Sequence, residues 1–340
     1  MQLEMDITTR CNIRCRMCYF SFDRYFFGKP VYFPPAEFER LAADVFPHVR
    51  TLTLSLGSEP LTSPHFPSFL ALAAASGVPE VSFHTNGLLM GPKIIDAILA
   101  SSVTHITISV DGASRETYEG IRVGADFATL ITNVRALVAA RTAAGRAHPV
   151  LRFGIVMMRA NAHEWADIVS FAAACGVEEV SLFHMVAYEG LGMEAESLVH
   201  DRPRSNAALQ AALERAEATG VRVVSHPGFF ADVEDPPDVP GAPSEVPPPF
   251  LPTPYCHYPF FHVSMNSGGH VLPCPFSHGE GPYGTVSETE SLTDIWLGPK
   301  FEALRRRILD HDPPPMCRRC SYLASHYPNH TELFAPRRAG

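Results

Sequence analysis

The chain has 340 residues, of which 46% are hydrophobic and 19% charged, and its net charge at pH 7 is −9. This balance is typical of a folded globular protein and argues against a disordered chain, and the acidic charge argues against a nucleic-acid partner. No apolar run approaches the roughly 20 residues of a membrane span. Because the start of the chain has no signal-peptide pattern, we expect a cytoplasmic protein without a membrane partner.

The first 225 residues alternate short β-rich runs with longer helical stretches. Strands are predicted over 3–7, 51–55, 80–84, 105–110, 151–157 and 179–183, and helices near 35–46, 65–76, 92–101, 126–144, 163–175 and 204–219. This alternation predicts an α/β fold with a parallel sheet and right-handed crossovers, either doubly wound or a partial barrel. In both folds, ligands bind at the carboxyl ends of the strands.

The composition changes after residue 225. Ten prolines fall between Pro227 and Pro254, which predicts an extended linker over 226–254. From residue 255 the pattern is compact again, with a predicted hairpin around Ser267–Gly269 and a helical stretch at 291–310. We therefore expect a core domain over 1–225, the linker over 226–254 and a small C-terminal domain over 255–340.

Eight cysteines are present, and seven of them form an N-terminal and a C-terminal group. In a cytosolic chain such grouping favours metal ligation over disulfides. Cys11, Cys15 and Cys18 follow the first predicted strand with C-x3-C-x2-C spacing. Three thiolates can hold three irons of a [4Fe–4S] cluster and leave the fourth iron open, whereas a closed structural site needs four protein ligands. A zinc site completed by a distant residue is the alternative.

The segment from Thr8 to Tyr19 closely resembles the cluster loop of radical S-adenosylmethionine (SAM) enzymes. The resemblance continues with Gly57-Ser58-Glu59-Pro60, which is similar to the family's Gly-Gly-Glu segment, and with Thr85-Asn86-Gly87 and Ser109-Val110-Asp111-Gly112. Two residues depart from the usual pattern. Met17 replaces an aromatic residue, and Ser58 replaces the second glycine.

The resemblance implies a set of SAM contacts. The backbone of 57–59 would contact the amino group, 109–112 would face the ribose and the methionyl end, and Arg122 matches an arginine that reaches the SAM carboxylate in anaerobic sulfatase-maturing relatives. The implied cofactor-binding residues are Met17, Gly57, Ser58, Glu59, Asn86, Ser109, Asp111 and Arg122.

The resemblance also implies a fold and a chemistry. The fold is a partial (β/α)6 barrel that resembles an incomplete TIM barrel. The open iron would chelate SAM, and a reduced cluster would cleave it to a 5′-deoxyadenosyl radical that abstracts hydrogen from an unactivated carbon. The cofactor performs the hard step, and the protein fixes distances and excludes water.

The C-terminal group consists of Cys256, Cys274, Cys317 and Cys320, enough thiolates to close a second cluster. With Gly269 five residues before Cys274, this region resembles the SPASM and twitch domains of many radical SAM enzymes. Full SPASM domains carry seven cysteines, so four favour the twitch arrangement with one auxiliary [4Fe–4S] cluster. That cluster would accept or relay an electron. A four-cysteine zinc ribbon is the alternative.

These expectations lead to three functional hypotheses. The first is radical oxidation of a small polar substrate, such as a sugar, cyclitol or nucleoside, because one auxiliary cluster is expected and the barrel begins at residue 3 without a preceding peptide-recognition domain. The second is a maturase that oxidises or crosslinks a ribosomally made peptide, since an acidic enzyme could attract a basic peptide. The third is a zinc-binding interaction protein. Either enzyme needs an electron donor such as flavodoxin or ferredoxin.

A few other residues fall near the predicted site. His184, at the end of the strand over 179–183, could accept a proton, although core packing is an open alternative for it and for His84. Cys175, at the end of a predicted helix, is interpreted as a buried structural thiol. The aromatic-rich segment from Phe20 to Phe33 is predicted to pack over the cluster.

Overall fold

The computed structural model describes residues 1–21, 29–188, 190–230, 256–277, 281–310 and 312–318. Six parallel strands follow one another across a curved sheet. They are β1 (Gln2–Met5), β3 (Thr51–Thr53), β4 (Glu80–Thr85), β5 (Val103–Ser109), β7 (Val150–Met157) and β8 (Glu179–His184). The predicted partial (β/α)6 barrel is confirmed.

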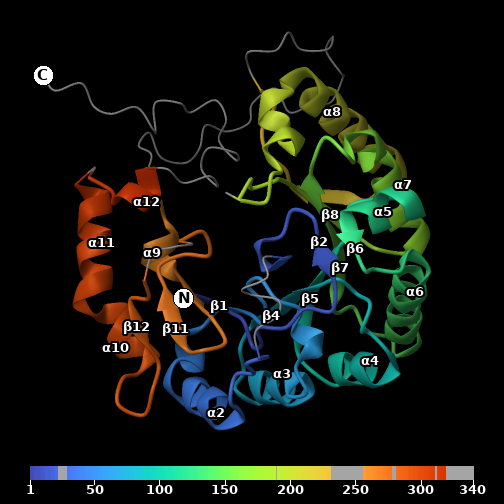
Figure 1. The fold of residues 1–340 in the computed structure, drawn as a ribbon. Coiled ribbons are helices and arrows are strands. Elements are labelled where there is room, and N and C mark those ends of the chain that lie inside the picture. Colours follow the sequence, from blue (N-terminus) through green and yellow to red (C-terminus); the bar gives the residue numbers. More distant parts are fainter. Residues whose placement is uncertain (22–28, 189, 231–255, 278–280, 311, 319–340) are drawn as a thin grey trace, which may run out of the picture.

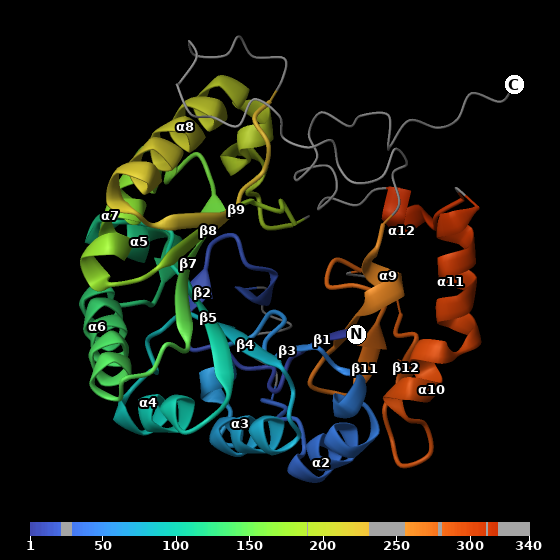
Figure 2. The ribbon, with the colours of Figure 1, turned by 180° about the vertical axis from the view of Figure 1, so that it is seen from behind.

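Helices cover the outer face of this sheet, as Figures 1 and 2 show. They are α2 (Pro35–Asp44), α3 (Phe66–Ala75), α4 (Pro92–Leu99), α6 (Phe127–Ala143), α7 (Trp165–Cys175) and α8 (Arg202–Thr219). Local signals set their ends: α2 has proline at its first position, and α7 ends at Gly176, which is left-handed with φ 73°. Cys175 at the end of α7 is buried, as predicted.

Alternation along the strands separates an apolar outer face from a polar inner face. Leu52, Phe83, Ile106, Phe153 and Leu182 are fully buried in the hydrophobic core. The residues between them point into the barrel, and many are polar; examples are Glu4, Thr53, Ser82, Thr107 and Arg152. The barrel interior therefore presents polar side chains below the carboxyl ends of the strands.

Several short elements of the barrel were not predicted from the sequence. Helix α5 (Arg115–Ile121) follows β5, and a two-stranded antiparallel pair joins β2 (Arg14–Cys15) to β6 (Arg122–Val123). Strand β9 (Arg222–Ser225) continues the sheet beside β8. Two-residue strands carry no readable periodicity, and their pairing depends on contacts between distant segments.

The C-terminal segment extends the same sheet. Strand β10 (His262–Met265) pairs in parallel with β1, so that Leu3 is opposite Val263. The predicted hairpin is confirmed: β10 and β11 (His270–Leu272) are antiparallel, and β12 (Gly284–Thr285) follows at the edge. In Figure 1 these strands lie beside β1, with α10 (Leu292–Leu297) and α11 (Pro299–Leu309) next to them.

The predicted helical stretch over 291–310 is confirmed, but it consists of two helices. The helix is divided at Gly298, which is extended with ψ 171°, and Pro299 starts α11. Proline disfavours a helical conformation for the residue before it, so α10 cannot continue into α11. Two single-turn helices, α9 (Tyr258–Phe261) and α12 (Pro315–Arg318), complete this segment.

Part of the predicted linker, 231–254, lies outside the described residues, as does Cys320. Within the described residues, no helix combines the length and the apolar character needed to cross a membrane.

Candidate active site at the carboxyl ends of the strands

A cavity of about 340 Å³ opens at the carboxyl ends of the barrel strands. The loops after β1, β3 and β4 and the ends of β5, β7 and β8 all contribute to its wall. Most of the residues predicted from the sequence line it: Cys11, Cys15, Met17, Cys18, Gly57, Ser58, Glu59, Asn86, Ser109, Arg122 and His184. Asp111 is fully buried and is not one of the lining residues.

The three N-terminal cysteines share this cavity. Cys15 lies in β2, where pairing with β6 places it opposite Arg122. Burial raises the pKa of the Cys11 and Cys18 thiols to about 12, and burial also raises the pKa of Cys15. Thiolates in such surroundings need positive charge, which bound iron supplies. The donor set therefore fits an iron-sulfur cluster held by these three residues.

Each thiolate of a [4Fe–4S] cluster binds a different iron, so the three sulfurs need not meet at one point. Cys11, Cys15 and Cys18 line one cavity, as such an arrangement requires.

Arg122 connects the cluster loop to the end of β5. Its Nη2 lies 2.7 Å from Oδ2 of Asp111, and its Nη1 donates to Sγ of Cys15 at 3.5 Å. The other carboxylate oxygen of Asp111 accepts from the backbone N–H of Val156 at 2.8 Å. Asp111 thus pairs with Arg122 at the cavity wall, and the SAM contact that the resemblance implies for Asp111 stays a prediction.

Glu59, in the loop after β3, is hydrogen-bonded to the loop after β4, and through Asn86 to the cluster loop. Its Oε1 accepts from Oγ1 of Thr85 at 2.8 Å and from the backbone of Leu61, and its Oε2 accepts from the backbone N–H of Asn86 at 2.7 Å. Asn86 in turn donates to Oδ1 of Asn12 in the cluster loop at 2.8 Å. Burial raises the pKa of Glu59 to about 7. The hydrogen bonds of Glu59 brace the loops around the cavity.

Aromatic side chains that include Tyr19 and Tyr188 line part of the cavity and are called the aromatic rim below. The ring centroids of Tyr19 and Tyr188 are 5.3 Å apart, and those of Tyr19 and Phe20 are 4.8 Å apart. Tyr19 packs tightly on Gly57: a Cβ at that position would lie 2.1 Å from the tyrosine hydroxyl. Tyr19 and Phe20 are thus placed at the cluster loop, and residues 22–28 of the predicted aromatic cover lie outside the described residues.

Two histidines line the cavity. His184, at the end of β8, is 3% exposed and packs against Phe230 with ring centroids 5.5 Å apart. His84 points inward from β4 and is accessible, although enclosure by the barrel lowers its pKa. Ser55 also lines the cavity, and it was not singled out from the sequence. It continues the alternation of β3 on the same face as the inward-facing Thr53, and that alternation could have identified it.

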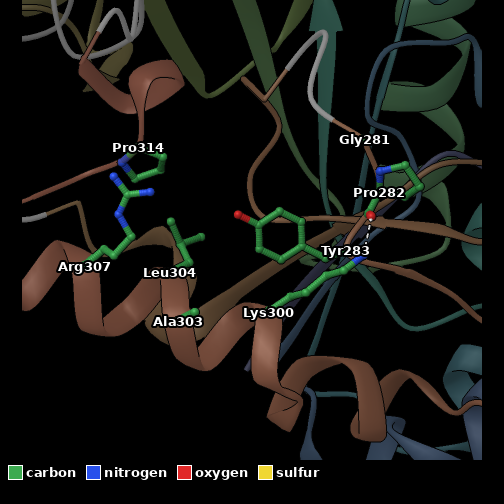
Figure 3. A pocket seen from close by; sticks show the side chains of 8 residues that line it. All are labelled: Gly281, Pro282, Tyr283, Lys300, Ala303, Leu304, Arg307 and Pro314. Atoms are coloured by element: carbon green, nitrogen blue, oxygen red, sulfur yellow. Dashed lines mark hydrogen bonds between the residues drawn. The ribbon is translucent and has the colours of Figure 1, made fainter.

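Three of the four C-terminal cysteines lie within the described residues. Cys256 precedes α9, Cys274 follows β11, and Cys317 lies in α12; all three are partly exposed. A separate cavity of about 400 Å³ lies in the C-terminal segment, between Gly281–Tyr283 and α11. Figure 3 shows its lining, in which Lys300 donates from Nζ to the carbonyl of Pro282 at 3.2 Å. No cysteine lines this second cavity.

Comparisons with known proteins agree with this geometry. The sequence model of the radical SAM superfamily matches residues 5–172, and that of the SPASM iron-sulfur cluster-binding domain matches residues 256–321. The mycofactocin maturase MftC of Mycobacterium ulcerans is 26% identical over 234 residues, 67% of this chain and 58% of the relative. GTP 3′,8-cyclase 1 of Mycobacterium tuberculosis is 26% identical over 182 residues, 52% of this chain and 49% of the relative. The match thus spans about half the length of such curated relatives.

Solved structures share the fold. SuiB of Streptococcus suis bound to S-adenosylmethionine superposes with a TM-score of 0.68 over 89% of this chain and 67% of that chain, at 14% identity. Native anSMEcpe with bound AdoMet gives 0.64 over 95% of this chain and 88% of that chain, also at 14% identity. The two family matches imply SAM, its [4Fe–4S] cluster and auxiliary iron-sulfur binding. The chain therefore belongs to the radical SAM superfamily and is an iron-sulfur enzyme with a C-terminal SPASM domain.

Proposed function

We propose that this enzyme modifies a ribosomally made peptide, by oxidation or crosslinking at a carbon from which hydrogen is abstracted. The observation that carries the proposal is the similarity to the maturase MftC, which extends over 67% of this chain. The shared fold adds support, because SuiB is also known bound to its precursor peptide SuiA, with a TM-score of 0.68 at 13% identity. On this support we prefer the peptide hypothesis to the small polar substrate that we expected first.

A nucleotide or another small polar substrate is the second candidate. Its support is the similarity to GTP 3′,8-cyclases, which covers 52% of this chain for the M. tuberculosis enzyme. The two candidates use the same cavity and differ in what must enter it.

When bound, the cluster and SAM supply a 5′-deoxyadenosyl radical that abstracts hydrogen from the substrate. Cys11, Cys15 and Cys18 hold the cluster in this proposal, and Arg122 lies against Cys15, held by Asp111. The braced loops at Ser58 and Asn86 and the end of β5 at Ser109 form the SAM side of the cavity. The aromatic rim of Tyr19 and Tyr188 limits the access of water, which protects reactive species.

An oxidised product requires that the substrate radical lose one electron and one proton. We assign the proton to His184 or His84 at the cavity wall, since a neutral imidazole is a suitable acceptor. The lowered pKa of His84 keeps its ring neutral near pH 7. The electron would pass to an auxiliary cluster held by Cys256, Cys274, Cys317 and Cys320, and flavodoxin or ferredoxin would reduce the SAM-binding cluster.

The test compares the two substrate classes directly. The reconstituted enzyme is incubated anaerobically with SAM, a reductant and either short peptides encoded next to its gene or a panel of nucleotides and sugars. We expect 5′-deoxyadenosine and a mass change in a peptide, while the small molecules stay unchanged. Turnover of a nucleotide or sugar, with every peptide unmodified, would replace this proposal by the second candidate.

A further inference from the structure

Asp6 was not singled out from the sequence, yet its carboxylate is one of the most heavily hydrogen-bonded groups near the cavity. It follows β1 and is 4% exposed. Its Oδ1 accepts from the backbone N–H groups of Leu56 at 2.9 Å, Gly57 at 3.1 Å and Ser58 at 3.1 Å. The hydroxyl of Ser58 donates to the same oxygen at 2.8 Å. One oxygen thus collects four donors from the loop after β3.

These hydrogen bonds fix which way the peptide groups of the loop face. A trans peptide is planar, so each N–H points opposite to the carbonyl of the preceding residue. With the N–H groups of 56–58 directed at Asp6, the carbonyl oxygens of Ser55, Leu56 and Gly57 point away from it. Residues 55–59 line the cavity, whereas Asp6 does not. The loop therefore lies between Asp6 and the cavity, with this row of carbonyl oxygens on the cavity side.

A row of carbonyl oxygens is an acceptor surface for a cationic donor and offers nothing to an anion. The backbone donors of this loop, by contrast, are already used by Asp6. The amino group of SAM carries ammonium donors, so the loop can receive it only in the orientation that Asp6 imposes. Because Asp6 is five residues before Cys11, the same strand end also carries the cluster loop, and the backbone N–H of Glu59 donates to the carbonyl of Arg10 at 3.0 Å.

We infer that Asp6 is a positioning residue for SAM: its carboxylate turns the Leu56–Ser58 backbone so that carbonyl oxygens face the cofactor, and it sets this surface relative to the cluster loop. The role acts through the backbone and needs no contact between Asp6 and SAM. It makes the SAM affinity depend on Asp6 separately from cluster binding.

The experiment uses cluster-reconstituted full-length protein and measures SAM binding per cluster by anaerobic equilibrium dialysis. Asp6→Ala removes the shared acceptor, and we expect the Kd for SAM to rise about 10- to 100-fold, the range for hydrogen bonds to a charged group. Asp6→Asn keeps a carbonyl oxygen for the same donors, so its Kd should lie between those of the parent and Asp6→Ala. If Asp6→Ala is too unstable to purify, a Kd of Asp6→Asn above that of the parent supports the inference, and an equal Kd overturns it.

A matched control is Glu178→Gln. Glu178 accepts from the backbone N–H of Leu151 at 3.0 Å, but at the amino end of β7, opposite the cavity. The Kd of the Glu178→Gln variant for SAM should stay within twofold of that of the parent. A second readout needs no cofactor: the amides of Leu56, Gly57 and Ser58 should lose protection from hydrogen exchange in Asp6→Ala and keep it in Glu178→Gln.

Two outcomes would overturn the inference. One is an Asp6→Ala protein that binds SAM within twofold of the parent, whatever its thermal stability. The other is loss of iron from the Asp6 variants with an unchanged Kd for SAM at the remaining clusters, which would make Asp6 a residue of cluster assembly.

Discussion

Replacing Arg122 by methionine tests the buried ion pair at the centre of the site. The side chain of Arg122 is 7% exposed and that of Asp111 is fully buried, and the two charged groups are 2.7 Å apart. Arg122→Met leaves the Asp111 carboxylate buried with only the Val156 N–H as a partner among the hydrogen bonds described above. Removing one partner of a buried pair costs about 3–5 kcal/mol, because the other charge stays uncompensated.

The unfolding entropy of a chain of this length, about 2.1 cal/mol/K for each residue, converts that loss into a melting temperature lower by about 4–7 °C. Thermal denaturation under anaerobic conditions, on samples of equal iron content, measures the shift. The matched control is Arg115→Met on α5, whose side chain is 76% exposed and pairs with Glu119 at 3.1 Å. Surface pairs contribute little, so this variant should shift by about 1 °C or less.

The double variant Asp111→Asn, Arg122→Met separates charge from packing. With both charges absent, no uncompensated ion remains, so the double variant should melt above Arg122→Met alone. An Arg122→Met protein that melts within about 1 °C of the parent, or a double variant that loses the sum of the two single losses, would refute the reasoning.

Three further predictions concern the same cavity. Gly57→Ala should weaken SAM binding in dialysis, because the new Cβ would lie 2.1 Å from the Tyr19 hydroxyl and 2.6 Å from Phe20. The control Gly91→Ala, whose Cβ would have no atom within 4 Å, should leave the Kd unchanged. Equal Kd values for the two variants would show that Tyr19 and Phe20 move aside without weakening SAM binding. Alanine at Cys11, Cys15 or Cys18 should remove about four irons for each chain in a colorimetric assay, and alanine at the buried Cys175 should remove none; iron retained without the three thiols would rule out their role as ligands. The pKa of Glu59 is raised to about 7, so between about pH 4.5 and 7 the folded state keeps a proton that the unfolded state releases, and the free energy of unfolding falls as the pH rises. Glu59→Gln should therefore make the melting temperature depend less on pH over that range. Melting curves of parent and variant with the same pH dependence would contradict the assignment.

Much of the barrel could be predicted from the sequence because its strands and helices are local patterns. The runs near 80–84 and 151–157 are uninterrupted and apolar on one face, and the structure has strands there. The cysteine spacing likewise placed three thiols on one loop, and the structure brings them to one cavity. Such features depend on neighbouring residues, which a single sequence displays.

What the sequence did not reveal depends on contacts between distant segments. Asp6 is separated from the loop that it holds by 50 residues, and β10 joins β1 across more than 250 residues. Asp111 lies in the predicted motif, but only the fold shows that its carboxylate forms an ion pair with Arg122. Ser55, which lines the cavity, could have been found from strand alternation once the barrel was assumed.

The central claim is that Cys11, Cys15 and Cys18 hold a cluster whose environment is open to SAM. Electron paramagnetic resonance of the reduced, reconstituted enzyme, in a variant with Cys256, Cys274 and Cys317 replaced by alanine, measures this cluster alone. We predict a [4Fe–4S] signal whose g-values change when SAM is added. A signal that is identical with and without SAM, or no cluster signal at all in protein that remains folded, would contradict the account.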